Sequence, residues 1–258
     1  MTDVPIVSIY RPVSTHRLHE SVVRQIVEQI ISGTLAPGAF LPSEPVLAQQ
    51  FGVSRTVIRE AMRILSGKGL VEVKHGSGMQ VQPAEQWNQL DPLLLFEQLR
   101  LGHDETLLND LLEARRIVEV EVAALAAVRR TPEDLRTLHE QVDGMRAILD
   151  DPRAYTRLDI AFHDTILQAA RNRFLTQTLR PASQALSVGR LISSQQPGGP
   201  VASEQGHEEI LAAIESANAE QARTAMHRHI LQFEQDIRTV LASGFSEKMA
   251  ELTQEFSL

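Results

Sequence analysis

One carboxylate and three imidazoles stand out in the second half of the chain. Asp159 and His163 are four residues apart in RLDIAFHDTIL, so on a helix their side chains share one face. His207 lies at the start of a helical segment, GHEEILAAIES, and His229 lies in the last long one, AMHRHILQF. This donor set suits zinc or nickel, and also manganese. These residues could therefore form a divalent metal site that keeps positions open for water or a ligand carboxylate.

Spacing by itself leaves other roles open for these residues. Asp-x-x-x-His pairs are common on solvated helix faces, and His227, two residues from His229, points to a different face. His103 and His139 fit surface positions. A metalloenzyme centre or a purely structural metal would use the same donors. Because no residue stands out as a dedicated general base, we expect no enzymatic activity.

A second group of residues suited to chemistry follows Ser54, a good helix N-cap. Arg55 and Arg59 share one face of the expected helix, Thr56 lies beside them, and Arg63 continues the face. Arginines in such positions suit bidentate contact with guanine or phosphate. The alternative is an ordinary solvated helix face. The surrounding elements decide between the two.

Those elements predict a winged helix-turn-helix. Apolar periodicity predicts helices in LHESVVRQIVEQIISG, in PVLAQQFG after the candidate N-cap Ser43, and in RTVIREAMRILSGKG. LVEVKHGSGMQVQ then alternates like two strands joined by a glycine-containing turn. His75 and Gly76 at this turn can enter a DNA groove or lie on the backbone. Two short helices, a tight turn and a hairpin in this order favour DNA binding.

The remainder of the chain reads as helices, so the fold class is mainly α, with an N-terminal winged helix-turn-helix and a C-terminal all-α helical bundle. The expected helices span about 92–100, 104–129, 132–149, 152–170, 173–194, 203–216 and 218–242. We expect a DNA-binding domain at 1–82, a linker at 83–91, a ligand-sensing domain at 92–243 and a tail at 244–258.

Composition and charge agree with this division. Hydrophobic residues make up 43% of the chain and charged residues 22%, which is typical of a globular protein. Cysteine is missing, which excludes disulfides and favours the cytoplasm, and no apolar run is long enough to span a membrane. The net charge of −8 divides into +2 for residues 1–80 and −10 for the rest. This division fits an N-terminal DNA-binding domain followed by an acidic domain.

Residues 18–82 resemble the winged helix of GntR-family regulators, through LPSE, GVSRT and REA in this order. The resemblance implies that Arg55 and Arg59 read bases, that Thr56 assists and that Gly76 approaches the minor groove. One position departs from the family pattern. An arginine that contacts DNA commonly follows LPSE, whereas this chain has Pro45, so we expect the operator preference to differ in detail.

Residues 92–243 resemble the FCD ligand-binding domain of the FadR branch, through LLEARRIVEVEVAALAA, LDIAFHDTILQAARN and GHEEILAAIESANAEQARTAMHRHI. The family's metal ligands fall on Asp159, His163, His207 and His229. Arg115 matches a pocket arginine that pairs with a ligand carboxylate, although it can instead simply pair with Glu119. The acyl-CoA-binding member of the branch lacks the four ligands, so the resemblance favours a small carboxylate.

Together these features predict a ligand-responsive transcriptional regulator. We expect a homodimer on a palindromic operator, because a two-fold symmetric protein matches two-fold symmetric DNA. A hydroxy or sugar acid bound at the metal and Arg115 is expected to weaken DNA binding and relieve repression. The sequence leaves open activation instead of repression, and a second domain that serves only for dimerisation.

Overall fold

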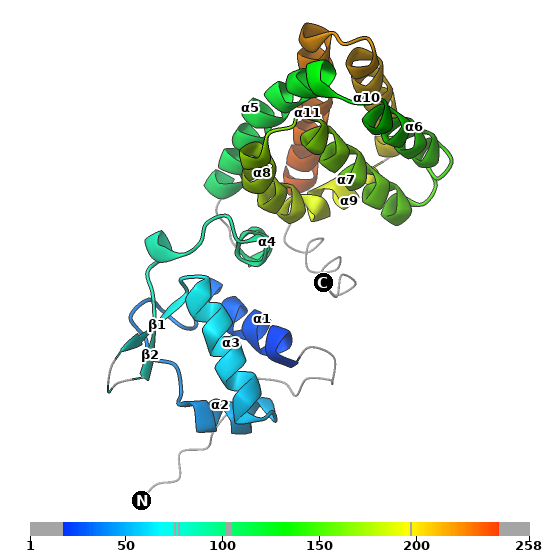
Figure 1. The fold of residues 1–258 in the computed structure, drawn as a ribbon. Coiled ribbons are helices and arrows are strands. Elements are labelled where there is room, and N and C mark those ends of the chain that lie inside the picture. Colours follow the sequence, from blue (N-terminus) through cyan, green and yellow to red (C-terminus); the bar gives the residue numbers. More distant parts are fainter. Residues whose placement is uncertain (1–17, 75, 77, 102–104, 197, 243–258) are drawn as a thin grey trace, which may run out of the picture. The chain divides into compact units, whose positions relative to one another are not determined.

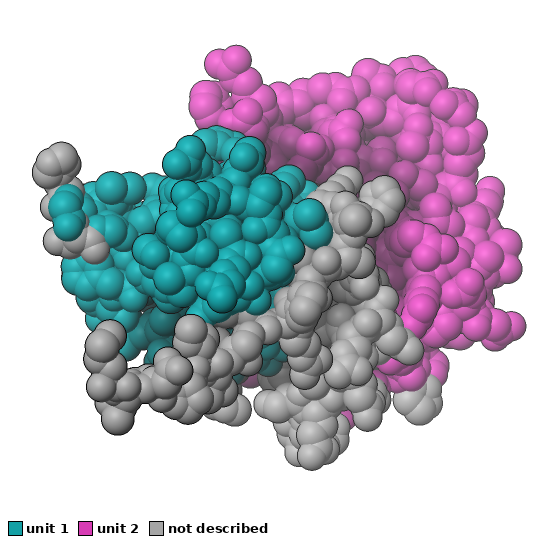
Figure 2. All heavy atoms as spheres, turned by 90° about the horizontal axis from the view of Figure 1, so that it is seen from below, with its two compact units in different colours: residues 1–103 teal, residues 104–258 magenta. Residues whose placement is uncertain are grey.

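The computed structural model describes residues 18–74, 76, 78–101, 105–196 and 198–242 of the chain. Two compact units follow one another in sequence, Met1–His103 and Asp104–Leu258 (Figures 1 and 2). The two large apolar clusters have no residue in common, one lying within each unit. Each unit is therefore organised around its own core.

The first unit contains a winged helix-turn-helix (Figure 1). Its elements are α1 (Leu18–Ile31), α2 (Glu44–Phe51), α3 (Arg55–Gly67), β1 (Val71–Lys74) and β2 (Gly78–Val81). The two strands are antiparallel, and their register pairs Val71 with Val81 and Lys74 with Gly78. The predicted order of three helices and a hairpin is confirmed.

Local sequence sets the ends of α2 and α3. The Ser54 hydroxyl accepts a hydrogen bond from the N–H of Val57 at 3.4 Å, which caps α3 as predicted. Ser43 occupies the N-cap position of α2, but its side chain makes no capping bond. The helix ends at Gly52, whose φ of +66° is the left-handed conformation that glycine adopts without strain. The short turn that follows fixes where α3 begins.

Helix α4 (Pro92–Leu101) packs with the winged helix. Its Leu94 is fully buried in the apolar cluster that α1 and α3 form. The 3-10 turn η1 (Ala84–Gln86) leads to α4, and the Trp87 indole donates to the Gln82 carbonyl at 3.0 Å. By packing, α4 belongs to the first unit, although the sequence groups residues from 92 onward with the helices that follow.

The second unit is helical throughout its described part, as predicted. Its helices are α5 (Glu105–Arg129), α6 (Pro132–Arg146), α7 (Pro152–Ala169), α8 (Arg173–Ala185), α9 (Ser187–Ser194), α10 (Gly199–Glu215) and α11 (Ala219–Ala242). Helices α5 and α11 pack along one another, and α7 and α10 also pack against α5. Aliphatic side chains fill the core, with Tyr155 and Phe162 as its aromatic members. Among the described helices, none combines the length and apolar character that crossing a membrane requires.

Three helix boundaries differ from the prediction by more than two residues. Helix α6 ends at Arg146, before the expected end near residue 149. The helix expected over 173–194 is divided into α8 and α9 at Leu186. The N–H groups of Leu186 and Arg190 still donate hydrogen bonds to the carbonyl groups four residues earlier, both at 3.0 Å. The helical hydrogen-bond pattern therefore continues through the break, and the spacing of apolar residues does not predict it. Helix α10 begins at Gly199, earlier than expected, because Pro200 is well tolerated in a first turn.

Gly69→Ala is expected to destabilise the first unit. Gly69 has φ +76°, and an added Cβ would lie 2.2 Å from the carbonyl oxygen of Gln86. The left-handed conformation alone costs a non-glycine residue about 1–2 kcal/mol, and the clash adds to this cost. Urea unfolding followed by the fluorescence of Trp87, the single tryptophan, measures the change.

Gly67→Ala is the matched control. A Cβ added at Gly67 meets no atom within 4 Å, and the residue lies in α3. Alanine should there leave the free energy of unfolding unchanged or raise it by up to ~1 kcal/mol. Equal unfolding midpoints for the two variants would contradict the role assigned to Gly69.

Candidate functional site

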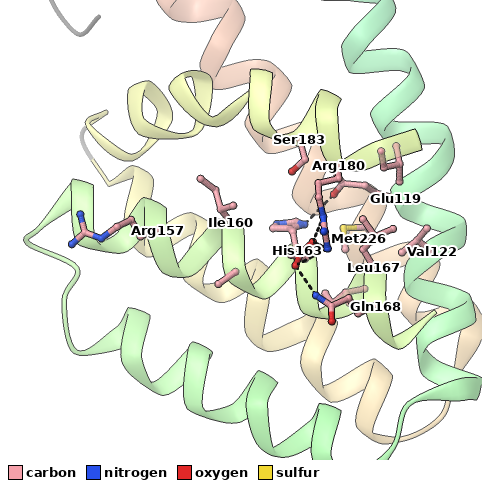
Figure 3. A pocket seen from close by; sticks show the side chains of 14 residues that line it. Glu119, Val122, Arg157, Ile160, His163, Leu167, Gln168, Arg180, Ser183 and Met226 are labelled. Carbon is pink, nitrogen blue, oxygen red and sulfur yellow. Dashed lines mark hydrogen bonds and ion pairs between the residues drawn. The ribbon is translucent and has the colours of Figure 1, made fainter. Parts of the chain in front are cut away.

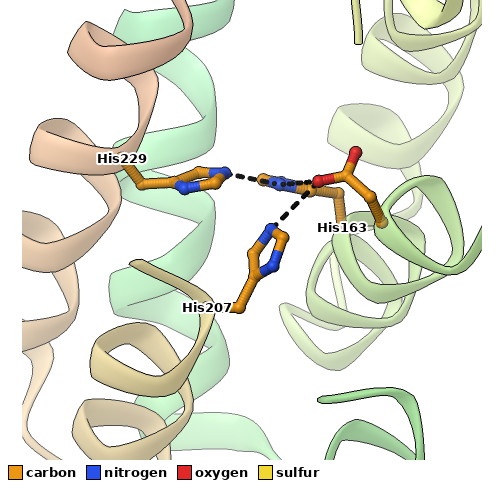
Figure 4. Close-up of side chains that lie close together, drawn as sticks. His163, His207 and His229 are labelled. Carbon is orange, nitrogen blue, oxygen red and sulfur yellow. Dashed lines mark hydrogen bonds and ion pairs between the residues drawn. The ribbon is translucent and has the colours of Figure 1, made fainter. Parts of the chain in front are cut away.

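The four predicted ligand residues come together inside the second unit (Figure 4). Asp159 and His163 lie one turn apart on α7, His207 comes from α10 and His229 from α11. All four side chains are buried, and their donor atoms lie within 4.8 Å of one another. His227, by contrast, is exposed.

The donor atoms converge closely enough to share one ion. His163 Nε2 lies 3.1 Å from His229 Nε2, and His207 Nε2 lies 3.0 Å from Asp159 Oδ1. Three imidazole nitrogens and one carboxylate oxygen in a dry interior are a donor set that divalent transition metals prefer. The residues present therefore fit a metal ion.

A second layer of polar groups lies against Nδ1 of two of the imidazoles. Glu119 Oε2 lies 3.0 Å from Nδ1 of His163. The Tyr155 hydroxyl lies 3.4 Å from Nδ1 of His207, and a carboxylate oxygen of Glu204 lies 3.8 Å from the same atom. Partners on Nδ1 leave Nε2 free to bind a metal. The sequence prediction missed this layer because its members become neighbours only when α5, α7 and α10 pack.

Arg115 is fully inside the unit, with 2% of its surface exposed. Its Nε donates to Glu119 Oε1 at 2.9 Å, and its guanidinium lies 4.4 Å from the ring centroid of Phe233. The pairing with Glu119 that the sequence offered as an alternative is thus present. This pairing uses Nε of the guanidinium, whereas Nη1 and Nη2 have no hydrogen-bond partner within the described ranges.

Arg190 on α9 is a site residue that the sequence prediction missed. It is 4% exposed, and its Nη1 donates to Asp159 Oδ2 at 2.5 Å. Its Nε and Nη2 have no hydrogen-bond partner among the residues that the structure describes. A lone arginine in the otherwise apolar and small stretch LSVGRLIS was the available signal. Arg190 places a second cation against the carboxylate of a predicted metal ligand.

Burial sets the protonation of the three imidazoles. It lowers the pKa of His163 to about 4, with the Arg190 charge acting in the same direction. Burial and the neighbouring imidazoles also hold the pKa of His229 well below its ordinary value. For His207 burial acts in that direction too, but Asp159 and Glu204 together outweigh burial and raise the pKa. His163 and His229 are therefore neutral near pH 7, in the form that binds metals.

The two central carboxyl groups stay ionised. Burial alone would raise the pKa of Asp159, but Arg190, His207 and His163 together outweigh burial and hold this pKa well below the ordinary range. Burial would likewise raise the pKa of Glu119, which Arg115, His163 and Arg190 together lower instead. Each buried carboxylate is thus stabilised by a buried guanidinium.

Two hollows reach the candidate centre. A cavity of about 520 Å³ includes Glu119 and His163 in a mainly apolar lining, and the Asp164–Arg180 ion pair (3.0 Å) also lines it (Figure 3). Its volume is in the range of small-molecule sites. A smaller hollow of about 20 Å³ is lined by the aromatic residues Tyr155 and Phe233 and by polar residues, which include Thr156, Asp159, Arg190, Ser193, Ser194, His229 and Asp236. A small molecule therefore has one roomy and one narrow, polar approach to the ligand residues.

The first turn of α3 presents the predicted DNA-reading residues to solvent. Arg55, Thr56 and Arg59 are all exposed. Arg59 Nε donates to Glu44 Oε2 at 2.9 Å, so the last residue of LPSE constrains this arginine. A helix N-terminus with exposed arginines is well suited to a phosphate backbone.

The other predicted DNA-binding residues are Arg63, His75 and Gly76. Arg63 is exposed and pairs with Glu60 at 2.6 Å, one turn earlier in α3. Gly76 is exposed, with a φ of +76° that glycine tolerates without strain. His75 lies outside the described residues.

Both units match known protein families. Residues 18–81 match the model "Bacterial regulatory proteins, gntR family", and residues 110–232 match the FCD domain. Both are domains of DNA-binding transcriptional regulators and not of enzymes.

Individual relatives and structures agree with these matches. The chain is 36% identical over 158 residues to the galactonate operon transcriptional repressor of Escherichia coli K12, covering 61% of this chain and 69% of that protein. It is 32% identical over 225 residues to the HTH-type transcriptional regulator LutR of Bacillus subtilis 168, covering 85% and 99%. The solved structure of Lar, which controls expression of the Listeria monocytogenes agr system, has the same fold, with a TM-score of 0.61 at 20% identity over 89% of this chain and 100% of that one. The chain therefore belongs to the GntR family of bacterial transcriptional regulators, in the branch that carries a C-terminal FCD domain.

Proposed function

We propose that this regulator is a metal-dependent repressor that a small organic acid releases from its operator. One observation carries the proposal. Four buried metal donors converge beside Arg115, whose two terminal guanidinium nitrogens have no partner within the described part of the chain. A carboxylate is the group that satisfies both a metal with open positions and a free guanidinium.

The residues that would hold the ion are Asp159, His163, His207 and His229. Zinc or nickel suits three imidazoles and one carboxylate best, and manganese is also compatible. When bound, the ion supplies positive charge toward an oxygen of the acid. Glu119 lies between the two groups: its Oε2 is 3.0 Å from Nδ1 of His163, and its Oε1 accepts a hydrogen bond from Arg115 Nε.

A hydroxy or sugar acid fits this arrangement. Its carboxylate would accept hydrogen bonds from the two free nitrogens of Arg115, and a hydroxyl oxygen would face the metal site. The name of the related galactonate operon transcriptional repressor, which contains the name of a sugar acid, supports this choice.

DNA binding falls to the winged helix, with Arg55, Thr56, Arg59, Arg63, His75 and Gly76 at the operator. We propose that the protein is a cytoplasmic homodimer and that each subunit contacts one half of a palindromic operator. The acid changes operator affinity only through a difference in its own affinity for the two arrangements of the dimer. The expected sign is release, so that the regulated genes are expressed when the acid is present.

Gly206→Ala is expected to weaken metal binding while leaving α10 intact. An added Cβ would lie 2.6 Å from Nδ1 of His229, so this imidazole must move. Affinity should fall by about 10–100-fold, the range found when a ligand loses its support. Competition with a chromophoric chelator measures the affinity, and circular dichroism checks the helix. Gln205→Ala, on the exposed side of the same turn, is the control and should bind metal normally. Unchanged affinity in Gly206→Ala would argue against His229 as a ligand.

The acid is expected to weaken operator binding only while metal is present. An operator is first selected from random DNA, and fluorescence anisotropy then gives its affinity with and without galactonate and related acids. A coupling of about 1–3 kcal/mol predicts a 5–150-fold loss of affinity. Chelator should abolish the response, and so should Arg115→Lys, which keeps the charge beside Glu119 but not the bidentate geometry. A chelator that only lowers the melting temperature, with no acid response at any point, would make the metal structural.

Arg59→Ala is expected to weaken binding to the selected operator by about 1–3 kcal/mol, because one base or phosphate contact is lost. Metal content should stay unchanged, since the substitution lies in the other unit. Arg136→Ala provides a matched control, because Arg136 is an exposed, ion-paired arginine of the second unit. If both variants bind the operator like the wild type, Arg59 does not read DNA.

A further inference from the structure

Two buried arginines flank one aromatic ring beside the candidate metal centre. The guanidinium of Arg115 lies 4.4 Å from the centroid of Phe233, and that of Arg190 lies 5.9 Å from the same centroid. Both also reach Glu119 Oε1, Arg115 at 2.9 Å and Arg190 at 3.8 Å. The two side chains come from α5 and α9, so packing brings two cations to one place.

Neither guanidinium is satisfied by protein groups. Nη1 and Nη2 of Arg115 and Nε and Nη2 of Arg190 are buried without a hydrogen-bond partner among the described residues. Buried donors are normally paired, because leaving one unpaired forfeits its hydration. Four such donors on two arginines indicate two separate places for anionic oxygens.

The position beside Arg190 has room for one small polar group. The narrow hollow of about 20 Å³ lies between Arg190, Asp159 and His229, which is about the space that one water molecule needs. The Ser193 hydroxyl donates to Asp236 at 2.5 Å and the Ser194 hydroxyl donates to the Leu191 carbonyl at 2.8 Å. Nε and Nη2 of Arg190 in the same wall have no hydrogen-bond partner among the described residues. One carboxylate oxygen matches this size and these two Arg190 donors better than a methyl or methylene group does.

We infer that Arg190 forms a second carboxylate subsite and that the effector is a hydroxy dicarboxylate, with one carboxylate at Arg115 and the other at Arg190. This inference rests on the proposed function and specifies its ligand class.

Matched acids that differ in one carboxylate test the inference. Full-length protein loaded with Zn²⁺, its metal content measured, is titrated calorimetrically with malate against 2-hydroxybutyrate and with galactarate against galactonate. In at least one pair the diacid should bind ten times more tightly or better. Monoacids that bind as tightly as their diacids in both pairs would overturn the second subsite and leave the proposed function standing. If none of the four acids binds, both ideas are wrong.

Variants of Arg190 separate ligand reading from support of the metal. In protein that retains its zinc, Arg190→Gln should lose more affinity for the diacid than for the matched monoacid, so that the preference for the diacid disappears. Arg190→Lys keeps a cation beside Asp159, so it preserves metal content if the glutamine variant loses zinc, and it should retain a reduced preference for the diacid. An equal loss of both acids in a variant that retains its zinc would show that Arg190 does not recognise a second carboxylate.

Discussion

Burial of charge is the constraint on which the second unit depends. Asp159 and Glu119 are ionised in a dry interior, and an isolated buried ion is so costly that it would lose its charge or disrupt the fold. Arg190 and Arg115 make these carboxylates tolerable, which requires α5, α7 and α9 to stay in contact. Removing one partner of such a group costs about 3–5 kcal/mol, because it leaves the other charge uncompensated. The same network also orients the candidate metal ligands, so stability and sensing depend on one set of contacts.

The two units expose their functional groups in opposite ways. The winged helix has an apolar core and keeps its arginines in solvent, where a phosphate can reach them without any rearrangement. The helical unit keeps its imidazoles and arginines inside, where each polar contact is stronger because water is excluded. Exposed arginines suit a large, charged polymer such as DNA, while a buried site suits a small molecule that must be distinguished from similar molecules.

The parts that the sequence predicted are those in which neighbours in space are also neighbours in sequence. The order of helices and hairpin, the Ser54 cap and the shared face of Asp159 and His163 all depend on local periodicity. Arg190 was missed because its partner Asp159 is 31 residues away and meets it only through helix packing. The bend at Leu186 was missed because helical hydrogen bonds continue through it. The resemblance to the FCD domain brought His207 and His229 to the site, which spacing alone could not do.

Helix α9 has a consequence for how the narrow hollow can be altered. It spans only eight residues, Ser187–Ser194, and contributes Arg190, Ser193 and Ser194 to the narrow hollow. None of the four candidate metal ligands lies on it. Substitutions of Ser193 or Ser194 would therefore reshape the wall of the hollow without replacing a candidate metal ligand or an exposed arginine of the winged helix.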